Sequence, residues 1–396
     1  MHFDLPLIGR NEAIFTQDIQ SNLQEIQDII SSSSFLIIGA AGSIGQAVTK
    51  EIFKRNPKIL HCVDISENNL VELVRDLRSS VGYIDGDFKT FAIDAGSLEF
   101  ECLFNSVGGY DYVMNLSALK HVRSEKDPFT IMRMLDVNIF NTVKTAEMAM
   151  SFGAKKYFCV STDKAANPVN MMGGSKRIME LFLNNLSTSL DISMARFANV
   201  AFSDGSLLYG FQNRIQKLQP IAAPNDIKRY FLSHQESGEL CLMSCLLGKN
   251  KDIFFPKLSE HLHLVTFSDI AIRYLESLGY EPYFCQSEVE AREKIEVLTN
   301  QKKWPCYFTS SDTTGEKDIE EFYTTSEELD LDKYHDIGIV QNSNQIEHEL
   351  LSKFKTEYNK IIHSEKVLKD DLLNLYYICL PDFIHEEKEK FLDDKM

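Results

Sequence analysis

Short apolar runs alternate with longer segments of helical spacing through the first half of the chain. The apolar runs are residues 35–38, 59–63, 90–93, 112–116, 156–160 and 193–197. The main segments with helical spacing are 46–55, 67–78, 136–150 and 175–186. Strands that alternate with helices in this way are typical of a parallel, doubly wound α/β sheet of the Rossmann type.

The pattern changes at both ends and in the second half of the chain. Residues 1–34 predict a helical N-terminal extension, docked on the main domain or on a partner subunit, and residues 35–200 predict the Rossmann domain. Residues 201–340 predict mainly a smaller C-terminal α/β lobe, with some segments returning to the first sheet. The charged residues 341–396 keep apolar positions at helical spacing and predict a helical tail.

Within the smaller lobe, the local signals are shorter. Residues 262–267 predict a strand, and residues 268–278 predict a helix with Ser268 as its N-cap. Residues 220–230 have the composition of a loop.

A glycine-rich turn follows the first strand. Its glycines have the spacing G-x-x-G-x-x-G, which permits a tight turn and close approach of a pyrophosphate to the N-terminus of the next helix. The candidate cofactor-binding residues in this turn are Gly39, Gly42, Ser43, Ile44 and Gly45. The alternative is a glycine turn that binds nothing.

Further candidate cofactor contacts stand at the ends of the following strands. Asp64 ends the second strand, where a carboxylate can bind the adenosine ribose hydroxyls and repel a 2′-phosphate, so NAD is favoured over NADP. Asp94 ends the third strand and could contact adenine. The remaining candidates are Ser66, Ala95, Leu116, Ala118 and Lys120.

A hydroxyl, an acid and a base follow the apolar run 156–160. They are Thr162, Asp163 and Lys164. In an open α/β sheet, ligands bind at the carboxyl ends of the strands. An adjacent carboxyl and amine could therefore donate and accept protons there. The alternative is an ion pair at the end of a strand with no catalytic part.

Composition limits the classes of protein that the chain can belong to. The chain has 396 residues, 44% of them hydrophobic, which suffices for one to three domains. A net charge of −17 disfavours nucleic acid and anionic membranes as general partners. No apolar run reaches membrane-spanning length and no signal peptide opens the sequence, so we expect a cytoplasmic protein without membrane insertion.

The eight cysteines show no paired spacing, which favours a reducing compartment. Cys241 and Cys245 are close in sequence, but they belong to an apolar helical run. We therefore expect them in the core and predict no metal site.

Residues 35–260 resemble the extended short-chain dehydrogenases/reductases, and within them the 4,6-dehydratases that act on NDP-N-acetylglucosamine. The resemblance extends to about residue 340 and is most specific to the soluble dehydratases of the legionaminic acid pathway. The residues that carry it are Gly39–Gly45, Ala118–Val122, Asn138, Ser161–Pro168, Lys176, Ile253–Lys257 and Thr314–Lys317.

The resemblance implies an NAD-dependent lyase reaction in nonulosonate or surface-glycan synthesis. The sugar is oxidised at C4, loses water across C5–C6 and receives the hydride at C6, giving an NDP-4-keto-6-deoxy-N-acetylglucosamine. Lys164 would take the C5 proton, Asp163 would protonate the leaving hydroxyl, and Lys176 would bind the nicotinamide ribose. Both catalytic groups would need shifted pKa values. The resemblance favours a GDP-sugar over a UDP-sugar and implies a homodimer or a larger homo-oligomer.

One position departs from the reductase pattern. The usual catalytic Tyr, four residues before the helix Lys176, is replaced by Met172. A thioether has no proton to exchange, so the C4 hydroxyl needs another base, or a water relayed through Thr162 or Lys176. A dehydratase branch with Met there is associated with retention at C5. The alternative is an inactive oxidoreductase used for binding.

The second half of the chain supplies the predicted substrate contacts. Arg229 is the preferred ligand of the diphosphate, because an Arg fork binds phosphate at two points. Asn138 is expected to be structural and to fix the backbone beside the site. The other substrate candidates are Lys120, Asn199, Ser206, Arg214, Lys257 and Lys317.

Two alternatives to a dehydratase remain open. An NDP-sugar 4-epimerase would share the cofactor and the sugar but would need no acid–base pair for elimination. A non-catalytic protein that binds NAD or a nucleotide-sugar would show no turnover.

Overall fold

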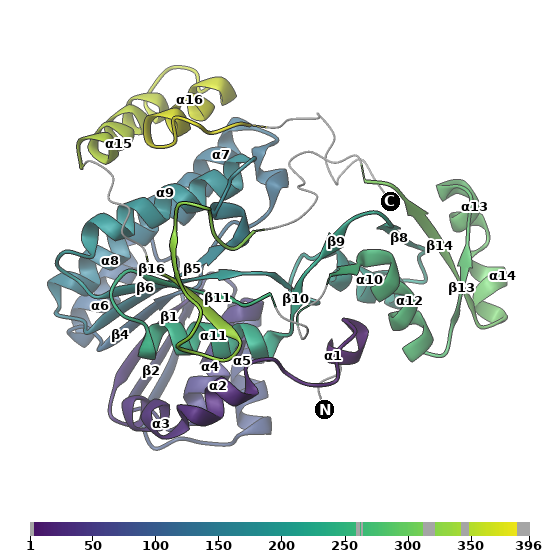
Figure 1. Cartoon of the computed structure of the whole chain (residues 1–396), viewed down its shortest axis with the longest axis horizontal. Coiled ribbons are helices and arrows are strands. Elements are labelled where there is room, and N and C mark those ends of the chain that lie inside the picture. Colours follow the sequence, from purple (N-terminus) through teal and green to yellow (C-terminus); the bar gives the residue numbers. More distant parts are fainter. Residues whose placement is uncertain (1–3, 259–261, 263, 312–320, 342–347, 386–396) are drawn as a thin grey trace.

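The computed structural model describes residues 4–258, 262, 264–311, 321–341 and 348–385. Within these residues, the main sheet has nine strands in the order β15-β16-β11-β6-β5-β4-β1-β2-β3 (Figure 1). The bounds are β1 Ser34–Ile38, β2 Ile59–Asp64, β3 Asp87–Ala92, β4 Tyr112–Asn115, β5 Lys156–Thr162, β6 Ile192–Phe197, β11 Asp252–Pro256, β15 Glu328–Asp330 and β16 Ile337–Gln341. Strands β1 to β6 and β11 are parallel, whereas β16 pairs antiparallel with β11 and with β15. The strand order 3-2-1-4-5-6 confirms the predicted doubly wound α/β fold.

Helices cover both faces of this sheet (Figure 1). Helices α4 (Ser43–Phe53), α5 (Glu67–Ser80) and α11 (His234–Leu247) pack on one face. Helices α6 (Leu98–Val107), α8 (Asn141–Ser151) and α9 (Met171–Leu186) pack on the other. With both faces covered, the central strands are mostly apolar, and the residues of β6 are all buried, Arg196 included.

The smaller lobe has its own sheet and core. Its three parallel strands are β8 (Ile221–Pro224), β14 (Lys303–Thr309) and β13 (Glu281–Phe284). Its helices are α10 (Leu207–Gln216), α12 (Phe267–Ser277), α13 (Glu288–Glu293) and α14 (Ile295–Asn300). A second cluster of buried apolar side chains, which includes Trp304, fills the space between them.

Two short strand pairs belong to neither of these sheets. They are β7 (Asn199–Val200) with β10 (Phe231–Leu232), and β9 (Lys228–Arg229) with β12 (Val265–Thr266). The prediction of a loop over 220–230 was therefore wrong, because β8 and β9 lie within it. The predicted strand 262–267 is reduced to β12.

Helix boundaries differ from the predictions where a side chain caps the helix. Thr266, not Ser268, caps α12, because the Thr266 hydroxyl accepts the amide of Asp269 at 3.0 Å. Helix α9 begins at Met171 instead of Ser175, because Asn170 Oδ1 accepts the Gly173 amide at 2.8 Å. The predicted helix 136–150 is α8 preceded by α7 (Pro128–Leu135) and a π-turn, Asp136–Phe140.

The N-terminal extension contacts both lobes. Helix α1 (Asp4–Leu7) contributes to the core of the smaller lobe, whereas α2 (Thr16–Ser21) and α3 (Leu23–Ser31) pack on the main core. Between them, Arg10 Nη2 donates to Glu236 Oε2 at 2.6 Å, and both side chains are buried. The predicted docking on the main domain is thus confirmed for α2 and α3 only.

The predicted helical tail forms a pair of helices, α15 (His348–Ile362) and α16 (Lys369–Cys379). They lie over α7 and α9, on the side away from the sheet (Figure 1). Their inward side chains, among them Phe354 and Tyr376, are buried in the main core.

None of the helices in the described part of the chain combines the length and the apolar character needed to cross a lipid bilayer.

Candidate active site

The glycine-rich turn connects β1 to α4 at the carboxyl edge of the sheet. Gly39 has φ +76, and a Cβ there would stand 2.7 Å from the amide nitrogen of Ser117. A Cβ at Gly45 would stand 2.0 Å from the carbonyl oxygen of Gly39. Packing within the protein therefore requires both glycines.

Gly42 differs from these two glycines. It is the N-cap of α4 with an ordinary extended conformation, and a Cβ there would come no closer than 3.7 Å to protein atoms. Packing within the protein therefore does not require a glycine at 42, and the free N–H groups in the first turn of α4 are a candidate site for a phosphate. Ser43 and Ile44 form the first turn of this helix.

The carboxylate of Asp64 lies beside the same turn. Its Oδ2 accepts the amide of Ala41 at 2.9 Å, and its Oδ1 accepts the amide of Ser66 at 2.9 Å. The side chain of Ser66 in turn caps α5 by accepting the amide of Asn69. These bonds hold an acidic group where the sugar of a dinucleotide would lie, so the turn and the acid together fit NAD.

Asp94, after β3, is already engaged. Its Oδ2 accepts Arg133 Nη2 at 2.7 Å, and its Oδ1 accepts the Gly96 amide at 2.8 Å. Burial raises the pKa of the Asp94 carboxyl, but these donors outweigh it and the net shift is downward. Ala95 lies next to this carboxylate in the chain and is half-buried.

The segment after β4 carries Leu116, Ala118 and Lys120. Leu116 donates its amide to the Ile38 carbonyl at 2.8 Å, which ties this segment to the start of the glycine turn. The side-chain amide of Asn138 bonds both the N–H and the C=O of Leu119, at 2.9 and 3.0 Å. The prediction that Asn138 fixes the backbone beside the site is thereby confirmed.

Thr162, Asp163 and Lys164 lie at the carboxyl end of β5, in a short 3₁₀ turn. Asp163 Oδ1 accepts the Thr162 hydroxyl at 2.7 Å and the Lys164 backbone amide at 2.8 Å, and lies 3.3 Å from Lys164 Nζ. The Asp163 side chain is 2% exposed and that of Lys164 is 28% exposed. A carboxylate and an amine thus lie in contact at the end of the strand, through Asp163 Oδ1.

Met172 and Lys176 lie one turn apart on α9, and both are buried. Lys176 Nζ donates to the Val160 carbonyl of β5 at 3.1 Å. Burial lowers the pKa of the Lys176 ammonium. The predicted bond from Lys176 to a nicotinamide ribose stays a prediction, because the amine is directed at the strand in this structure.

Lys120 meets a loop from the second half of the chain. Its Nζ donates to the Ser203 hydroxyl at 3.2 Å, and burial lowers its pKa. In the same loop, the Asp204 amide donates to Ser43 Oγ at 2.8 Å. The loop 203–205 therefore reaches the glycine-rich turn, a contact between residues 161 positions apart that local sequence patterns do not reveal.

The other substrate candidates occupy separate elements. Asn199 lies in β7 and Arg229 in β9, and Arg229 is a buried residue whose Nη1 donates to the Lys228 carbonyl at 2.9 Å. Ser206 caps α10 through the Tyr209 amide, and Arg214 lies on that helix. Lys317 lies outside the described residues.

The side chain of Lys257 is surrounded by backbone carbonyls. Its Nζ donates to the carbonyls of Leu331, Tyr334 and His335. These carbonyls belong to a turn that lines a groove together with Gln17 of α2 and Asn22. Lys257 therefore holds the turn 331–335 in place, and its predicted contact with a substrate stays a prediction.

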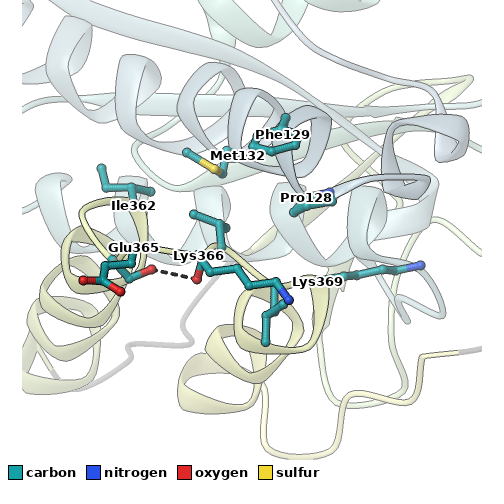
Figure 2. A pocket seen from close by; sticks show the side chains of 10 residues that line it. Pro128, Phe129, Met132, Ile362, Glu365, Lys366 and Lys369 are labelled. Atoms are coloured by element: carbon teal, nitrogen blue, oxygen red, sulfur yellow. Dashed lines mark hydrogen bonds between the residues drawn. The ribbon is translucent and has the colours of Figure 1, made fainter.

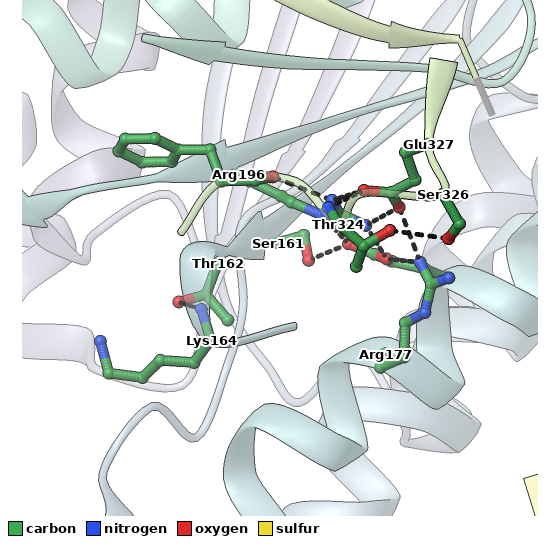
Figure 3. Close-up of polar contacts among 10 residues, drawn as sticks. Ser161, Thr162, Lys164, Arg177, Arg196, Thr324, Ser326 and Glu327 are labelled. Carbon is green, nitrogen blue, oxygen red and sulfur yellow. Dashed lines mark hydrogen bonds and ion pairs between the residues drawn. The ribbon is translucent and has the colours of Figure 1, made fainter. Parts of the chain in front are cut away.

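A buried ion network lies beside the end of β5. Arg196 on β6 makes two-point contacts with Glu180 of α9 and with Glu327, at 2.8–3.0 Å (Figure 3). Ser161 donates to Glu180 at 2.6 Å, whereas the Lys164 side chain extends away from the network. This ion network was not predicted from the sequence, although a charged residue inside the apolar strand 193–197 indicates that the charge must be paired in the core.

A groove between α7 and the tail lies away from these residues. Its volume is about 700 Å³, and it separates α7 from the turn between the two tail helices (Figure 2). Phe129 and Met132 line one wall, and the turn 362–369 lines the other. The lining contains none of the predicted site residues.

Comparison with protein families adds a specific match. A family model described as polysaccharide biosynthesis protein matches residues 35–342. An uncharacterized membrane protein of Methanocaldococcus jannaschii is 30% identical over 331 residues, 80% of this chain and 88% of the relative. A Campylobacter jejuni protein named UDP-N-acetylglucosamine 4,6-dehydratase (inverting) is 25% identical over 325 residues, 78% of this chain and 88% of the relative.

Some relatives are much longer than the matched region. The probable polysaccharide biosynthesis protein EpsC of Bacillus subtilis is 28% identical over 297 residues, which cover 70% of this chain and 48% of the relative. The chain thus spans about half the length of that relative.

Solved structures agree on the fold. The structure of Pen from Bacillus thuringiensis has a TM-score of 0.63 and 21% identity, covering 83% of this chain and 98% of that chain. DesIV of Streptomyces venezuelae, a dTDP-glucose 4,6-dehydratase solved with NAD and TYD bound, has a TM-score of 0.55 and 14% identity, covering 73% of this chain and 88% of that chain. These likenesses confirm the predicted Rossmann-like architecture.

Proposed function

Since the chain belongs to the polysaccharide biosynthesis protein family, we propose that it is a nucleotide-sugar 4,6-dehydratase that uses NAD and acts on an NDP-N-acetylglucosamine. The observation that carries the proposal is the group Thr162, Asp163 and Lys164 at the carboxyl end of β5. An epimerase exchanges hydride at C4 alone and has no use for an acid–base pair that serves C5 and C6.

The proposed cofactor has a fitting site on this chain. The N-terminus of α4 at Gly42 would hold the pyrophosphate, and the Asp64 carboxylate would hold the adenosine ribose. When bound, NAD supplies the hydride acceptor and donor for the sugar carbons C4 and C6.

The side chains account for the proton movements. Thr162 is hydrogen-bonded to Asp163 at 2.7 Å, so a proton taken from the C4 hydroxyl through Thr162 has a carboxylate to receive it. Asp163 then gives that proton to the leaving C6 hydroxyl, which departs as water. Lys164 removes the C5 proton and returns one to C5 when C6 is reduced. The sum of these steps is the loss of one water from the sugar.

This route removes the need for a tyrosine at position 172. Met172 is 3% exposed and is an apolar wall, not a proton carrier. The proposal therefore differs from a reductase mechanism in using the hydroxyl of Thr162 where a reductase uses a phenol.

The nucleotide of the substrate and the configuration of the product at C5 are separate questions. The legionaminic resemblance favours GDP, and the resemblance to the branch with Met at position 172 favours retention at C5. The Campylobacter jejuni relative is instead named for a UDP-sugar and for inversion. We favour N-acetylglucosamine as the sugar in either case, for nonulosonate or surface-glycan synthesis.

The experiment is mass spectrometry of the purified protein incubated with UDP- or GDP-N-acetylglucosamine in deuterated water. Loss of one water with gain of one deuterium at C5 supports 4,6-dehydration, and NMR of the product gives the configuration at C5. An unchanged mass with a new chromatographic isomer would show an epimerase. No change with either sugar, in protein that holds NAD, would favour a binding protein.

A further inference from the structure

Glu125 connects three segments that are far apart in the sequence. It ends the 3₁₀ turn Val122–Glu125 after the Lys120 segment, and its side chain is 2% exposed. Its Oε1 accepts the backbone amide of Met172 at 3.0 Å, and its Oε2 lies 2.9 Å from Nε2 of His385. His385 follows the tail helices and is itself 6% exposed.

The bond to Met172 acts on the start of α9. The first amides of a helix have no partner inside the helix and must be satisfied from outside. Asn170 takes the Gly173 amide and Glu125 takes the Met172 amide, and a carboxylate is favourable at the positive end of the helix dipole. The orientation of the turn that presents Met172 and Lys176 therefore depends on Glu125.

The tail also packs directly on the same turn. A Cβ at Gly174 would stand 2.7 Å from Cδ1 of Tyr376, so α16 approaches α9 at a residue without a side chain. Phe383 stacks on Tyr376 with ring centroids 5.4 Å apart, just before His385. The tail is thus seated against the N-terminal turn of α9 by both packing and a hydrogen bond.

Tyr376 does not replace the missing catalytic tyrosine. Residues in a helix are separated by about 100° of rotation. Gly174 is two residues from Met172 and from Lys176, so Tyr376 contacts the opposite face of α9. Tyr376 packs against Gly174 of α9 and against Phe383.

We propose that His385, acting through Glu125, is a positioning residue for the active site. The end of the tail holds the Lys120 segment and the first turn of α9 in one arrangement, and this sets where Met172 and Lys176 stand relative to β5. The inference rests on the proposed function for its effect on catalysis, but the positioning itself can be measured without turnover.

The first test is hydrogen–deuterium exchange of the full-length chain. His385→Ala should speed exchange of the amides in 118–126 and 170–176 by about tenfold or more, because Glu125 loses its buried partner. His385→Gln should restore slow exchange, because its side-chain amide can donate to Glu125 from a similar place. His363→Ala, at an exposed histidine just after α15, is the matched control and should leave both segments unchanged.

The second test measures turnover in the same variants. His385→Ala should lower kcat by about tenfold or more, since a misplacement of about 1 Å can cost about 100-fold. The KM for the nucleotide-sugar and the NAD content should change less than about twofold. His385→Gln should recover most of kcat.

The outcomes separate this inference from the proposed function. If exchange in 118–126 and 170–176 is the same in His385→Ala and in wild type, the positioning is wrong whatever the protein catalyses. If exchange responds as expected but wild type has no dehydratase activity, the proposed function fails and the positioning stands. Should His385→Ala not fold, His385→Leu serves instead, because it fills the buried place of the imidazole but has no group that can bond to Glu125; unchanged exchange there would equally overturn the inference.

Discussion

Lys164 Nζ lies 3.3 Å from Asp163 Oδ1, and the two side chains differ sharply in exposure. The carboxylate is 2% exposed and the ammonium side chain is 28% exposed. The Lys164 amine is therefore the more accessible of the two groups at the end of β5. In the proposed reaction, a substrate at this end of the strand would meet the base first.

Lys164→Ala should abolish dehydration and leave NAD bound. Removal of a general base typically costs 10²–10⁴ in rate, and Lys164 lies outside the glycine-rich turn that would hold the cofactor. Turnover by mass spectrometry and NAD content after denaturation are the two measurements. Lys155→Ala is the control, because its side chain is 60% exposed and pairs only with Asp111 among the described contacts. Full activity of Lys164→Ala would remove Lys164 from the mechanism.

Gly42→Ala and Gly45→Ala should fail in different ways. Gly45→Ala forces a Cβ within 2.0 Å of the Gly39 carbonyl and should prevent correct folding of the turn. Gly42→Ala has room in the protein and should fold with an unchanged Tm, but its methyl group would fill the space proposed for the pyrophosphate. Cofactor content should then fall by about tenfold or more. Normal NAD binding by Gly42→Ala would place the cofactor elsewhere.

Met172→Leu should keep activity within about threefold of wild type. The side chain is buried and the exchange conserves volume, which buried sites tolerate well. Thr162→Val, in contrast, removes the hydroxyl proposed to accept the C4 proton and should lower kcat by about 100-fold or more. The comparison of kcat for the two variants checks the proton route; equal losses would argue against it.

Arg196→Met should destabilise the fold strongly. The guanidinium is fully buried between Glu180 and Glu327, and its removal leaves two buried carboxylates without their main partner. Breaking such a buried pair costs about 3–5 kcal/mol, which urea unfolding at neutral pH can measure. Arg292→Met, which breaks an exposed i,i+4 pair, should cost less than about 0.5 kcal/mol.

The stabilisation by Glu180 should disappear on acidification. Burial raises the pKa of the Glu180 carboxyl, but Arg196, Arg177 and Ser161 outweigh burial and lower the pKa to about 2. A depressed pKa means that the stabilisation is complete above the ordinary pKa of a glutamate and is lost as the pH falls toward 2. The free-energy difference between wild type and Glu180→Gln should therefore shrink between pH 5 and about pH 2. A constant difference over that range would contradict the assignment.

Phe354→Ala should loosen the tail without touching the candidate site directly. Phe354 is fully buried between Phe140 and Phe182, with ring centroids about 6 Å from each. Loss of a buried Phe side chain costs about 3–5 kcal/mol. Limited proteolysis of α15 and urea unfolding are the measurements, with Lys353→Ala at an exposed position of the same helix as the control.

Elements with a strong local pattern were predictable. The strands β1, β2, β4, β5 and β6 and the glycine-rich turn follow from continuous apolar runs with glycine or polar residues at their ends. The placement of Thr162, Asp163 and Lys164 at a strand end follows in the same way, because a chain that leaves a buried strand places its next polar residues at the edge of the sheet.

Boundaries set by single hydrogen bonds were not predictable. Whether Thr266 or Ser268 caps α12 depends on which hydroxyl reaches the Asp269 amide once β12 pairs with β9. The same holds for the start of α9, where a Gly-Gly pair concealed a helical turn held by Asn170 and Glu125.

The sequence by itself determined the α/β class, the glycine-rich turn, the acid and base at the end of β5, and the absence of a phenol at position 172. Only the tertiary structure decided that Lys176 bonds to Val160, that Lys257 holds the turn 331–335, and that His385 reaches Glu125 across 260 positions of the chain. The physical reason is the sequence distance over which each kind of interaction acts. Apolar periodicity and backbone propensity act between neighbours in sequence, whereas the partner of a buried polar group is chosen by whichever segments the folded core brings together.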